Sequence, residues 1–142
     1  MYSLVTTIGL RFGAVVDGIT IEKGLVFHPF GFFGSCLSKT SCVNRQDTLD
    51  EDEKVQSITY GRSVYDSYLN FICKLSFHTN KRVLGPFSTW RCSEPIYRVD
   101  IPSEMMLLDF FNQNLKTKLT LHRESGNYEQ FFDGFNSEYT TS

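Results

Sequence analysis

A run of alternating apolar and polar residues between Phe71 and Asn80 constrains the fold of this chain more than any other segment. Every second residue from 71 to 77 is apolar: Phe71, Cys73, Leu75 and Phe77. Because successive side chains of a β-strand point to opposite faces, this spacing predicts a strand with one buried and one exposed face. A polar turn at 79–82 follows, and a second run leads into Gly85-Pro86-Phe87.

Similar short runs recur along most of the chain, separated by Gly, Pro, Asp and Asn. They predict strands at 8–12, 19–22, 25–28, 55–60, 96–101, 106–111, 118–122 and 128–135. The stretch 104–115 comes nearest to helical spacing, but Pro102 and its paired aromatic residues favour a strand. Short strands with a turn signal about every ten residues predict an all-β fold, either a sandwich or a closed barrel-like form.

Composition limits the classes of function. The 142 residues predict one domain with a real core, and the formal charge of −2 comes from interspersed acidic and basic residues. We expect no nucleic-acid partner, because no basic stripe is present to follow a phosphate backbone. We expect no membrane span, because the sequence contains no run of about 18 apolar residues.

The four cysteines, Cys36, Cys42, Cys73 and Cys92, have spacings that fit no structural zinc site. The N-terminus has neither the basic start nor the apolar stretch of a signal peptide. We therefore expect reduced thiols, with Cys73 packing as a small hydrophobic residue, and a cytoplasmic location ahead of a secreted one. If the protein is secreted, Cys36 and Cys42 are the easiest pair to join.

Candidates for catalysis and metal binding are weak. The histidines His28, His78 and His122 are scattered, and no Gly-x-Ser-x-Gly elbow or phosphate-binding loop is present. The acidic residues of 47–53 lack the alternation and the central glycine of a calcium loop, so we interpret them as a solvated loop. We expect no enzymatic activity, no metal and no cofactor.

Several segments, taken in order, resemble the jacalin-related lectins. The most specific are Leu75-Ser76-Phe77, Thr79-Asn80-Lys81 and Gly85-Pro86-Phe87, and weaker ones lie at 7–19, 30–34, 49–55, 96–101 and 107–110. The resemblance covers roughly residues 6 to 122. It implies a β-prism of three four-stranded antiparallel sheets, and a metal-free, non-enzymatic protein that binds glycans.

The opening strand of that family is missing ahead of residue 6, and 125–134 is similar to it. We therefore expect a jacalin-like domain at 1–123 and a C-terminal tail at 124–142. The tail has two open interpretations. It supplies the missing first strand, by circular permutation within one molecule or by exchange between two, or it is a disordered extension.

The resemblance also implies a sugar site built on a Gly-x-x-x-Asp loop, where the carboxylate accepts hydrogen bonds from two sugar hydroxyls. Without gaps, the loop here reads Leu115-Lys116-Thr117-Lys118-Leu119, which lacks both the glycine and the aspartate. Neighbouring polar and aromatic groups remain available for a neutral polyhydroxylated ligand. The candidate carbohydrate-binding residues are Asp66, Tyr68, Asn70, Asn112, Gln113, Asn114, Lys116, Thr117, Gly126 and Asn127.

The leading hypothesis is a lectin-like module whose partner is a mono- or oligosaccharide. Because one shallow site binds weakly, useful avidity would need a homo-oligomer or tandem domains. One alternative is a prism that has lost sugar binding and serves as a protein–protein interaction or assembly module, with the aromatic stretch 27–33 as its contact surface. A further alternative is a small hydrolase on an unrelated β-sandwich.

Overall fold

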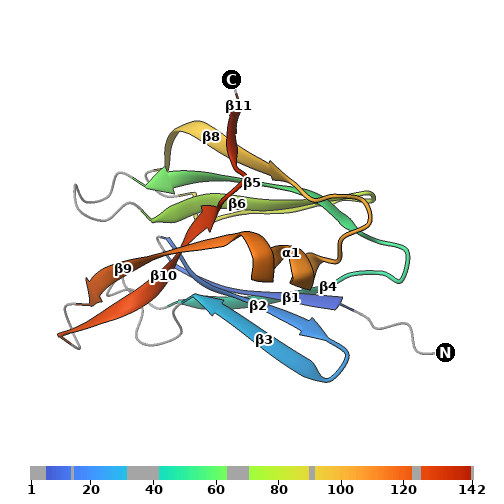
Figure 1. Ribbon diagram of the computed structural model, residues 1–142, viewed down its shortest axis with the longest axis horizontal. Coiled ribbons are helices and arrows are strands. Elements are labelled where there is room, and N and C mark those ends of the chain that lie inside the picture. Colours follow the sequence, from blue (N-terminus) through green and yellow to red (C-terminus); the bar gives the residue numbers. More distant parts are fainter. Residues whose placement is uncertain are drawn as a thin grey trace.

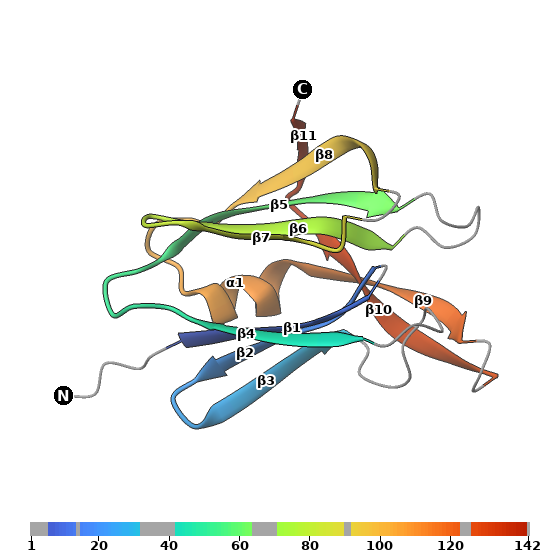
Figure 2. The same ribbon diagram turned by 180° about the vertical axis from the view of Figure 1, so that it is seen from behind.

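The computed structural model describes residues 6–13, 15–31, 42–63, 71–89, 92–122 and 126–141. Within these ranges the chain folds into strands β1 to β11 and one short helix, α1. The strands form three antiparallel sheets around a shared apolar interior (Figures 1 and 2). The described residues contain no helix that is long and apolar enough to cross a membrane.

The first sheet has the strand order β3-β2-β1-β4. Its strands are β1 (Thr6–Phe12), β2 (Val16–Lys23), β3 (Val26–Gly31) and β4 (Val43–Thr48). The register places Ile8 opposite Ile21 and Leu10 opposite Ile19, and all four side chains are buried. Period-two alternation in β1 and β2 therefore gives the sheet one apolar face that covers the interior.

The second sheet has the strand order β11-β8-β5-β6-β7. Its strands are β5 (Val55–Ser63), β6 (Ile72–Thr79), β7 (Val83–Phe87), β8 (Cys92–Asp100) and β11 (Tyr139–Thr141). The predicted strand at 71–78 is confirmed as β6, in which Leu75 and Phe77 are fully buried. Ile72 and Ser76 on the other face are buried too, so β6 is covered on both sides more completely than its alternation predicted.

The third sheet is a two-stranded ribbon of β9 (Leu115–His122) and β10 (Asn127–Phe135). Helix α1 (Leu107–Asn114) comes directly before β9 and lies between the other two sheets (Figure 1). The strand predicted at 106–111 is wrong. Phe110 and Phe111 are both buried, and adjacent residues can share a buried side on a helix, whereas a strand points them to opposite faces.

Aromatic rings fill the centre of the molecule. Phe135 packs against Phe110, Phe111 and Phe132, with ring centroids 5.5, 5.1 and 5.5 Å apart. These residues come from α1 and β10, so both elements contribute to the same core as the two larger sheets. The core residues with zero exposure include Ile19, Ile58, Tyr60, Ile72, Leu75, Phe77, Val99, Phe111 and Phe135.

The polar segment interpreted as a solvated loop is also partly structured. Residues 43–48 form strand β4, which pairs with β1 although nearly all of its side chains are exposed. Within the acidic run at 47–53, Glu53 is buried and forms an ion pair with Arg82. The loop interpretation of 47–53 is therefore wrong for 47–48, which pair with β1 as the end of β4, and for Glu53, which is buried beneath the partly exposed Arg82.

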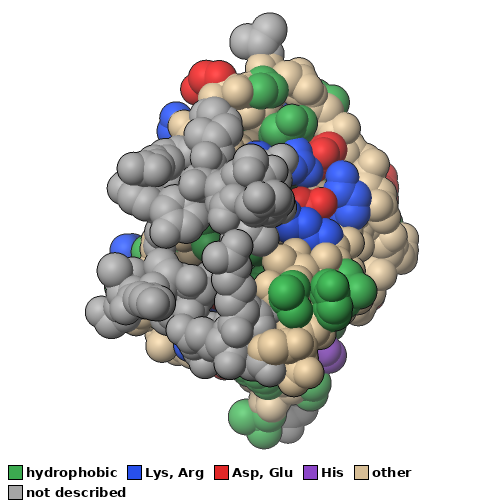
Figure 3. Space-filling model, turned by 90° about the vertical axis from the view of Figure 1, so that its left-hand side faces the viewer, with side chains coloured by type: hydrophobic (Ala, Val, Ile, Leu, Met, Phe, Trp, Pro, Cys, Tyr) green, Lys and Arg blue, Asp and Glu red, His purple; other side chains and the backbone are tan. Residues whose placement is uncertain are grey.

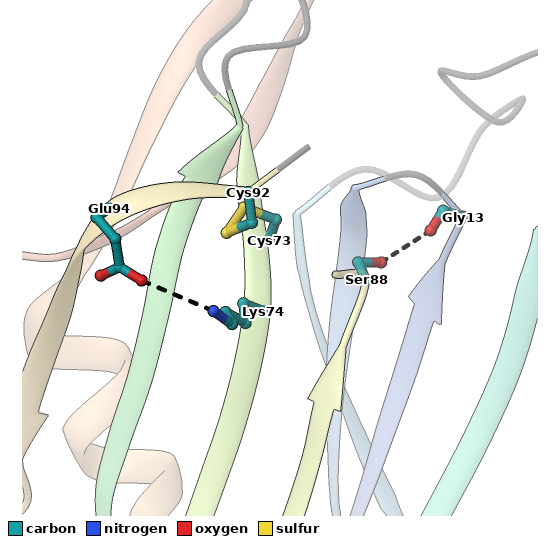
Figure 4. Close-up of a disulfide and its surroundings, with 6 residues drawn as sticks. All are labelled: Gly13, Cys73, Lys74, Ser88, Cys92 and Glu94. Atoms are coloured by element: carbon teal, nitrogen blue, oxygen red, sulfur yellow. Dashed lines mark hydrogen bonds and ion pairs between the residues drawn. A yellow bond between two sulfur atoms is a disulfide. The ribbon is translucent and has the colours of Figure 1, made fainter. Parts of the chain in front are cut away.

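The prediction of reduced thiols is wrong. Cys73 of β6 and Cys92 of β8 form a disulfide, as shown in Figure 4. Cys42 is disulfide-bonded as well, and the predicted Cys36–Cys42 pairing lies outside the described residues because Cys36 is not among them. Disulfides persist in oxidising environments, which weakens the argument for a cytoplasmic location.

Near the disulfide, the two larger sheets are joined by a polar contact. The Ser88 hydroxyl, just after β7, donates a hydrogen bond of 2.9 Å to the Gly13 carbonyl, just after β1 (Figure 4). On the outer side of the second sheet, Lys74 and Glu94 lie 3.8 Å apart as an exposed ion pair. Exposed pairs of this kind contribute little to stability, so the disulfide and the interior are what hold β6 and β8 together.

The predicted boundary between 1–123 and 124–142 falls between β9 and β10. β10 pairs with β9 over most of its length, and β11 continues to the edge strand β8. The described part of the tail, 126–141, is therefore packed on the rest of the molecule. That β10 takes the place of the family's opening strand stays a prediction.

Candidate functional site

The seven predicted binding residues that the structure describes do not gather at one point. Asn112, Gln113 and Asn114 form the last turn of α1, and Lys116 and Thr117 follow at the start of β9. Gly126 and Asn127 lie past the far end of β9. Thr117 lies five residues before position 122, which pairs with Asn127, so at about 3.3 Å per residue the two groups are at least about 17 Å apart, more than one monosaccharide can span. The remaining three, Asp66, Tyr68 and Asn70, lie outside the described residues.

The residues at the end of α1 serve the fold. The Asn114 side chain donates to the Phe110 carbonyl at 3.2 Å and accepts from the Ser137 hydroxyl at 3.5 Å. Its own carbonyl accepts from the Asn136 N–H at 2.8 Å, which fixes the turn between β10 and β11. Asn112 and Gln113 are exposed. These contacts give Asn114 a structural role. The sequence shows only that an amide is present and does not show which groups it contacts.

Lys116 belongs to a charged network around Glu138. Its ammonium lies 3.4 Å from Glu138 Oε1, and the Arg62 guanidinium donates to the same carboxylate at 3.0 Å. Arg62 also donates to the Asp133 carbonyl at 3.0 Å and lies over the Tyr97 ring at 4.2 Å. The network joins β5, β9 and β10 to the segment before β11.

Tyr60 closes this network from the interior. Its hydroxyl donates to Glu138 Oε2 and accepts from the Phe135 N–H at 3.1 Å. Burial raises the pKa of Tyr60 well above its usual range, and the adjacent Glu138 carboxylate raises it further. Burial would raise the pKa of Glu138, but the Tyr60 hydrogen bond and the Arg62 charge lower it overall. Both groups therefore hold fixed protonation states at neutral pH.

The β9–β10 hairpin forms an exposed tip at one end of the molecule. Position 122 pairs with Asn127, so the turn lies between them, and Gly126 has a φ of +71°. A Cβ added at Gly126 would meet nothing within 4 Å. Next to this turn, Tyr128 is 65% exposed and pairs with Leu121, which is 46% exposed. An open glycine turn beside an accessible aromatic ring is suited to stacking on a sugar.

An aromatic cluster connects the hairpin to the β5–β6 segment. Phe131 of β10 packs edge-on against Phe71 with ring centroids 5.4 Å apart, and Val15 completes this small buried cluster. The Ser63 N–H donates to the Phe71 carbonyl at 2.8 Å, so the two ends of the segment 64–70 are held together. Lys118 lies over the Phe71 ring at 4.8 Å. The start of β6 is therefore packed directly against β9 and β10 through Phe71.

These elements lie at one end of the molecule. The end of β5, the start of β6 and the tip of the β9–β10 hairpin are all on the left in Figure 1 and on the right in Figure 2. Figure 3 looks onto this end and shows acidic and basic side chains side by side next to hydrophobic ones. Charged and hydrophobic groups therefore meet at the end of the molecule where β5 ends, β6 begins and the β9–β10 hairpin turns.

A groove of about 360 Å³ lies away from this end. Its walls are the segment between β4 and β5 and the segment before α1. The lining residues that carry charge are Glu51, Asp52, Glu53, Lys54 and Glu104. None of the predicted binding residues lines it, and the residues that the structure describes contain no group of three or more histidine, cysteine or acidic side chains placed to hold a metal.

The predicted binding residues include Gly126 and Asn127 but not the neighbouring Tyr128. The gap-free alignment placed the ligand loop at 115–119, which the structure shows to be the first part of a strand. The turn between the last two long strands instead leads into Gly126-Asn127-Tyr128-Glu129-Gln130. A signal was present in the sequence, since Ser125-Gly126-Asn127 is a strong turn motif between two alternating runs.

No protein-family model matches the sequence, and no curated protein matches it. Solved structures do match. A mannose-specific jacalin-related lectin from Morus nigra in complex with mannose has a TM-score of 0.51 at 22% identity, covering 72% of this chain and 68% of that one. A mannose-binding jacalin-related lectin from Ananas comosus has a TM-score of 0.55 at 15% identity, covering 93% and 78%.

A third match extends over nearly the whole chain. A jacalin complex with melibiose, Gal-α(1-6)-Glc, has a TM-score of 0.54 at 15% identity and covers 97% of this chain and 92% of that one. Identity at this level establishes architecture and carries no residue-level correspondence. Together with the three antiparallel sheets, these matches confirm the predicted fold: the chain is an all-β protein with the jacalin-like β-prism fold.

Proposed function

We propose that this protein is a non-enzymatic, lectin-like module that binds a glycan at the end of the prism where β5 ends, β6 begins and the β9–β10 hairpin turns. The observation that carries the proposal is the exposed ring of Tyr128, 65% accessible, beside the open turn at Gly126. Sugar recognition needs fixed hydrogen-bond donors and acceptors together with an apolar face for the pyranose ring. The hairpin supplies both kinds of group within a few residues.

The hairpin sequence supports this placement. The segment 126–130 reads Gly-Asn-Tyr-Glu-Gln. Compared with the Gly-x-x-x-Asp loop of the jacalin-related lectins, it has the glycine in first place and glutamine in place of the aspartate. An amide oxygen accepts hydrogen bonds from sugar hydroxyls, but it lacks the charge that makes carboxylate hydrogen bonds stronger. We therefore propose weak binding of a neutral glycan, with Glu129 of the hairpin or the predicted residue Asp66 as the carboxylate.

The matched structures support the ligand class. The Morus nigra and Ananas comosus proteins are described as mannose-specific and mannose-binding, and the jacalin complex holds a galactose-containing disaccharide. These descriptions of sugar binding apply to the matched proteins. For this chain, mannose and galactose are the first two series to test.

The decisive experiment is a glycan array, followed by titration calorimetry of any binder, on the wild type, Tyr128→Ala and Asn127→Ala. We expect both substitutions to weaken binding by about tenfold or more, as loss of a stacking or hydrogen-bonding contact does. Tyr139→Ala is the matched control, because Tyr139 is also a 45% exposed tyrosine but lies on β11 of another sheet. Tyr68→Ala tests the 64–70 segment. Binding that survives every hairpin substitution would overturn the placement of the site.

A specific observation also favours the alternative of an assembly module. Leu25, Val26 and Phe27 at the β2–β3 turn are 104, 57 and 53% exposed, so part of the predicted aromatic stretch is accessible. Phe30 instead packs on Phe111 with ring centroids 5.2 Å apart. No binding to any glycan on the array, together with a stable complex that Phe27→Ser disrupts, would favour this alternative over sugar binding.

A further inference from the structure

The third sheet is incomplete compared with the other two. The first sheet has four strands and the second has five, whereas β9 and β10 pair only with each other among the described residues. An isolated two-stranded ribbon is marginally stable, and an open strand edge presents unpaired N–H and C=O groups to any complementary strand. β9 is eight residues long, which is long enough to form a specific ladder with another strand.

The outward face of β9 carries no charge. Its outward positions are Thr117, Leu119 and Leu121, and the two leucines are 60 and 46% exposed. The lysines of β9 lie on the other face, where Lys116 contacts Glu138 and Lys118 lies over Phe71. The strand therefore combines an open edge with an apolar, uncharged outer face, an arrangement typical of a surface that another strand covers.

We propose that a second copy of this chain covers this edge, with the two β9 strands antiparallel across a two-fold axis at Leu119. In that register, Leu119 meets Leu119 of the partner subunit, and Leu121 meets Thr117 of the partner subunit. The pairing joins two ribbons into one four-stranded sheet, the size that a β-prism wall is expected to have. A two-fold axis uses the same surface of both copies, so no unpaired edge of β9 remains.

Charge fixes this register among its neighbours. With the axis at Leu119, Lys118 lies opposite Thr120 of the partner subunit, and Lys116 lies opposite position 122. Moving the axis to Lys118 would place the two copies of that lysine opposite each other, which is destabilising. Moving it to Thr120 would limit the ladder to 118–122 and leave Lys116 outside it. Leu119 is therefore the position that gives the longest ladder without opposed lysines.

The arrangement leaves the hairpin tips free. In an antiparallel β9–β9 pair, the two turns at Gly126 point in opposite directions and lie at opposite ends of the shared sheet. The dimer would present two copies of the tip, whatever they bind, and two linked sites raise avidity without any new contact. The inference does not depend on sugar binding, because it rests on the edge and face of β9 alone.

Sedimentation equilibrium over a concentration series tests the assembly directly. We expect the wild type to approach twice its chain mass of 16.4 kDa. Leu119→Lys places two ammonium groups at the axis and should weaken the dimer by at least about tenfold, equivalent to about 1.4 kcal/mol. The control is Leu25→Lys at the β2–β3 turn, where the side chain is 104% exposed and far from β9, and it should leave the dimer intact.

A second pair of variants tests the register without relying on disruption. Leu119→Cys should form an intersubunit disulfide on mild oxidation, and Leu25→Cys should not. Unchanged thermal unfolding of each variant shows that it is folded. A wild type that stays monomeric up to tens of micromolar, a Leu119→Lys dimer as strong as the wild type, or equal cross-linking at both positions would overturn the proposal. A dimer that binds no glycan would uphold it and refute the proposed function.

Discussion

Arg82 holds the carboxylate of Glu53 with two donors, Nε at 2.9 Å from Oε2 and Nη2 at 3.2 Å from Oε1. The Glu53 side chain has no exposed surface, whereas Arg82 is 44% exposed. The Thr79 hydroxyl donates to the same carboxylate at 2.7 Å. This cluster joins the segment before β5 to the β6–β7 turn. The Arg82 hydrogen bonds and, secondarily, the Thr79 hydrogen bond lower the pKa of Glu53 to about 2.

The first prediction concerns acid stability. Because the pKa of Glu53 is lowered from 4.5 to about 2 on folding, its stabilising effect is present above pH 4.5 and is lost as the pH falls toward 2. After allowance for solvent around Arg82, the effect amounts to about 1 to 2 kcal/mol. Urea unfolding at pH 7 and pH 3 should show a smaller loss for Glu53→Gln than for the wild type. Glu51→Gln, on an exposed neighbour, should behave as the wild type, and equal losses in all three proteins would contradict the prediction.

The second prediction concerns the Cys73–Cys92 disulfide, which joins residues 19 positions apart. A crosslink that closes a loop of this size restricts the unfolded chain and contributes about 3 kcal/mol. The double substitution Cys73→Ala with Cys92→Ala should lower the free energy of unfolding by about that amount. Thiol titration of the native protein, purified without reductant, provides the check on the bond itself. Free reactive thiols at these two positions would contradict it.

Much of the fold could be predicted because alternation is a direct consequence of strand geometry. β1, β2, β5, β6 and β8 all carry apolar residues at period two over part of their length, and this pattern predicted them as strands. β4 was missed because its pairing with β1 is made by backbone groups, which leave no pattern in an exposed edge strand. α1 was missed because eight residues are too few to display helical periodicity, and because Pro102 and the paired aromatic residues favoured a strand.

The candidate site was only partly predictable for a different reason. Gly126 and Asn127 were predicted within a segment similar to the family's glycine-rich opening strand, and the structure places them at the turn of the β9–β10 hairpin. Residues 115–119 were predicted as a loop because a strand was expected at 106–111, whereas α1 occupies 107–114 and β9 begins directly at residue 115. The disulfide was missed because Cys73 and Cys92 meet only through the pairing of β6 and β8 with β5, a non-local relationship that spacing does not reveal.

A third prediction compares two glycines with positive φ. At Gly134, φ is +96°, and a Cβ would lie 2.6 Å from the Tyr60 hydroxyl and 2.7 Å from Glu138 Oε2. Gly134→Ala should therefore combine backbone strain with a steric clash and cost about 3 kcal/mol. At Gly126, φ is +71° and the surroundings are open, so Gly126→Ala should cost only about 1 kcal/mol. Chemical denaturation of both variants measures the difference, and equal losses would show that the space around Gly134 can relax.

The last prediction concerns the hydrogen bonds of the Tyr60 hydroxyl, which lies in the core between β5 and β10. Tyr60→Phe removes the donor to Glu138 and the acceptor of the Phe135 N–H, and leaves both groups without this partner in a buried site. Unsatisfied buried groups are costly, so we expect a loss of about 2 kcal/mol. Tyr139→Phe is the matched control, because the Tyr139 hydroxyl also donates to a carboxylate, that of Asp100 at 2.6 Å, but on the exposed surface. It should cost less than about 0.5 kcal/mol.

A double-mutant cycle with Glu138→Gln separates the hydrogen bond from the packing of the ring. Because Tyr60 and Glu138 are in direct contact, their substitutions should be non-additive by about 1 kcal/mol or more. The pKa of Tyr60 is raised, so its hydroxyl stays protonated and the coupling should be constant from pH 7 to pH 9. Additive effects at Tyr60 and Glu138 would mean that the charged network around Arg62 holds β10 and β11 in place without the tyrosine.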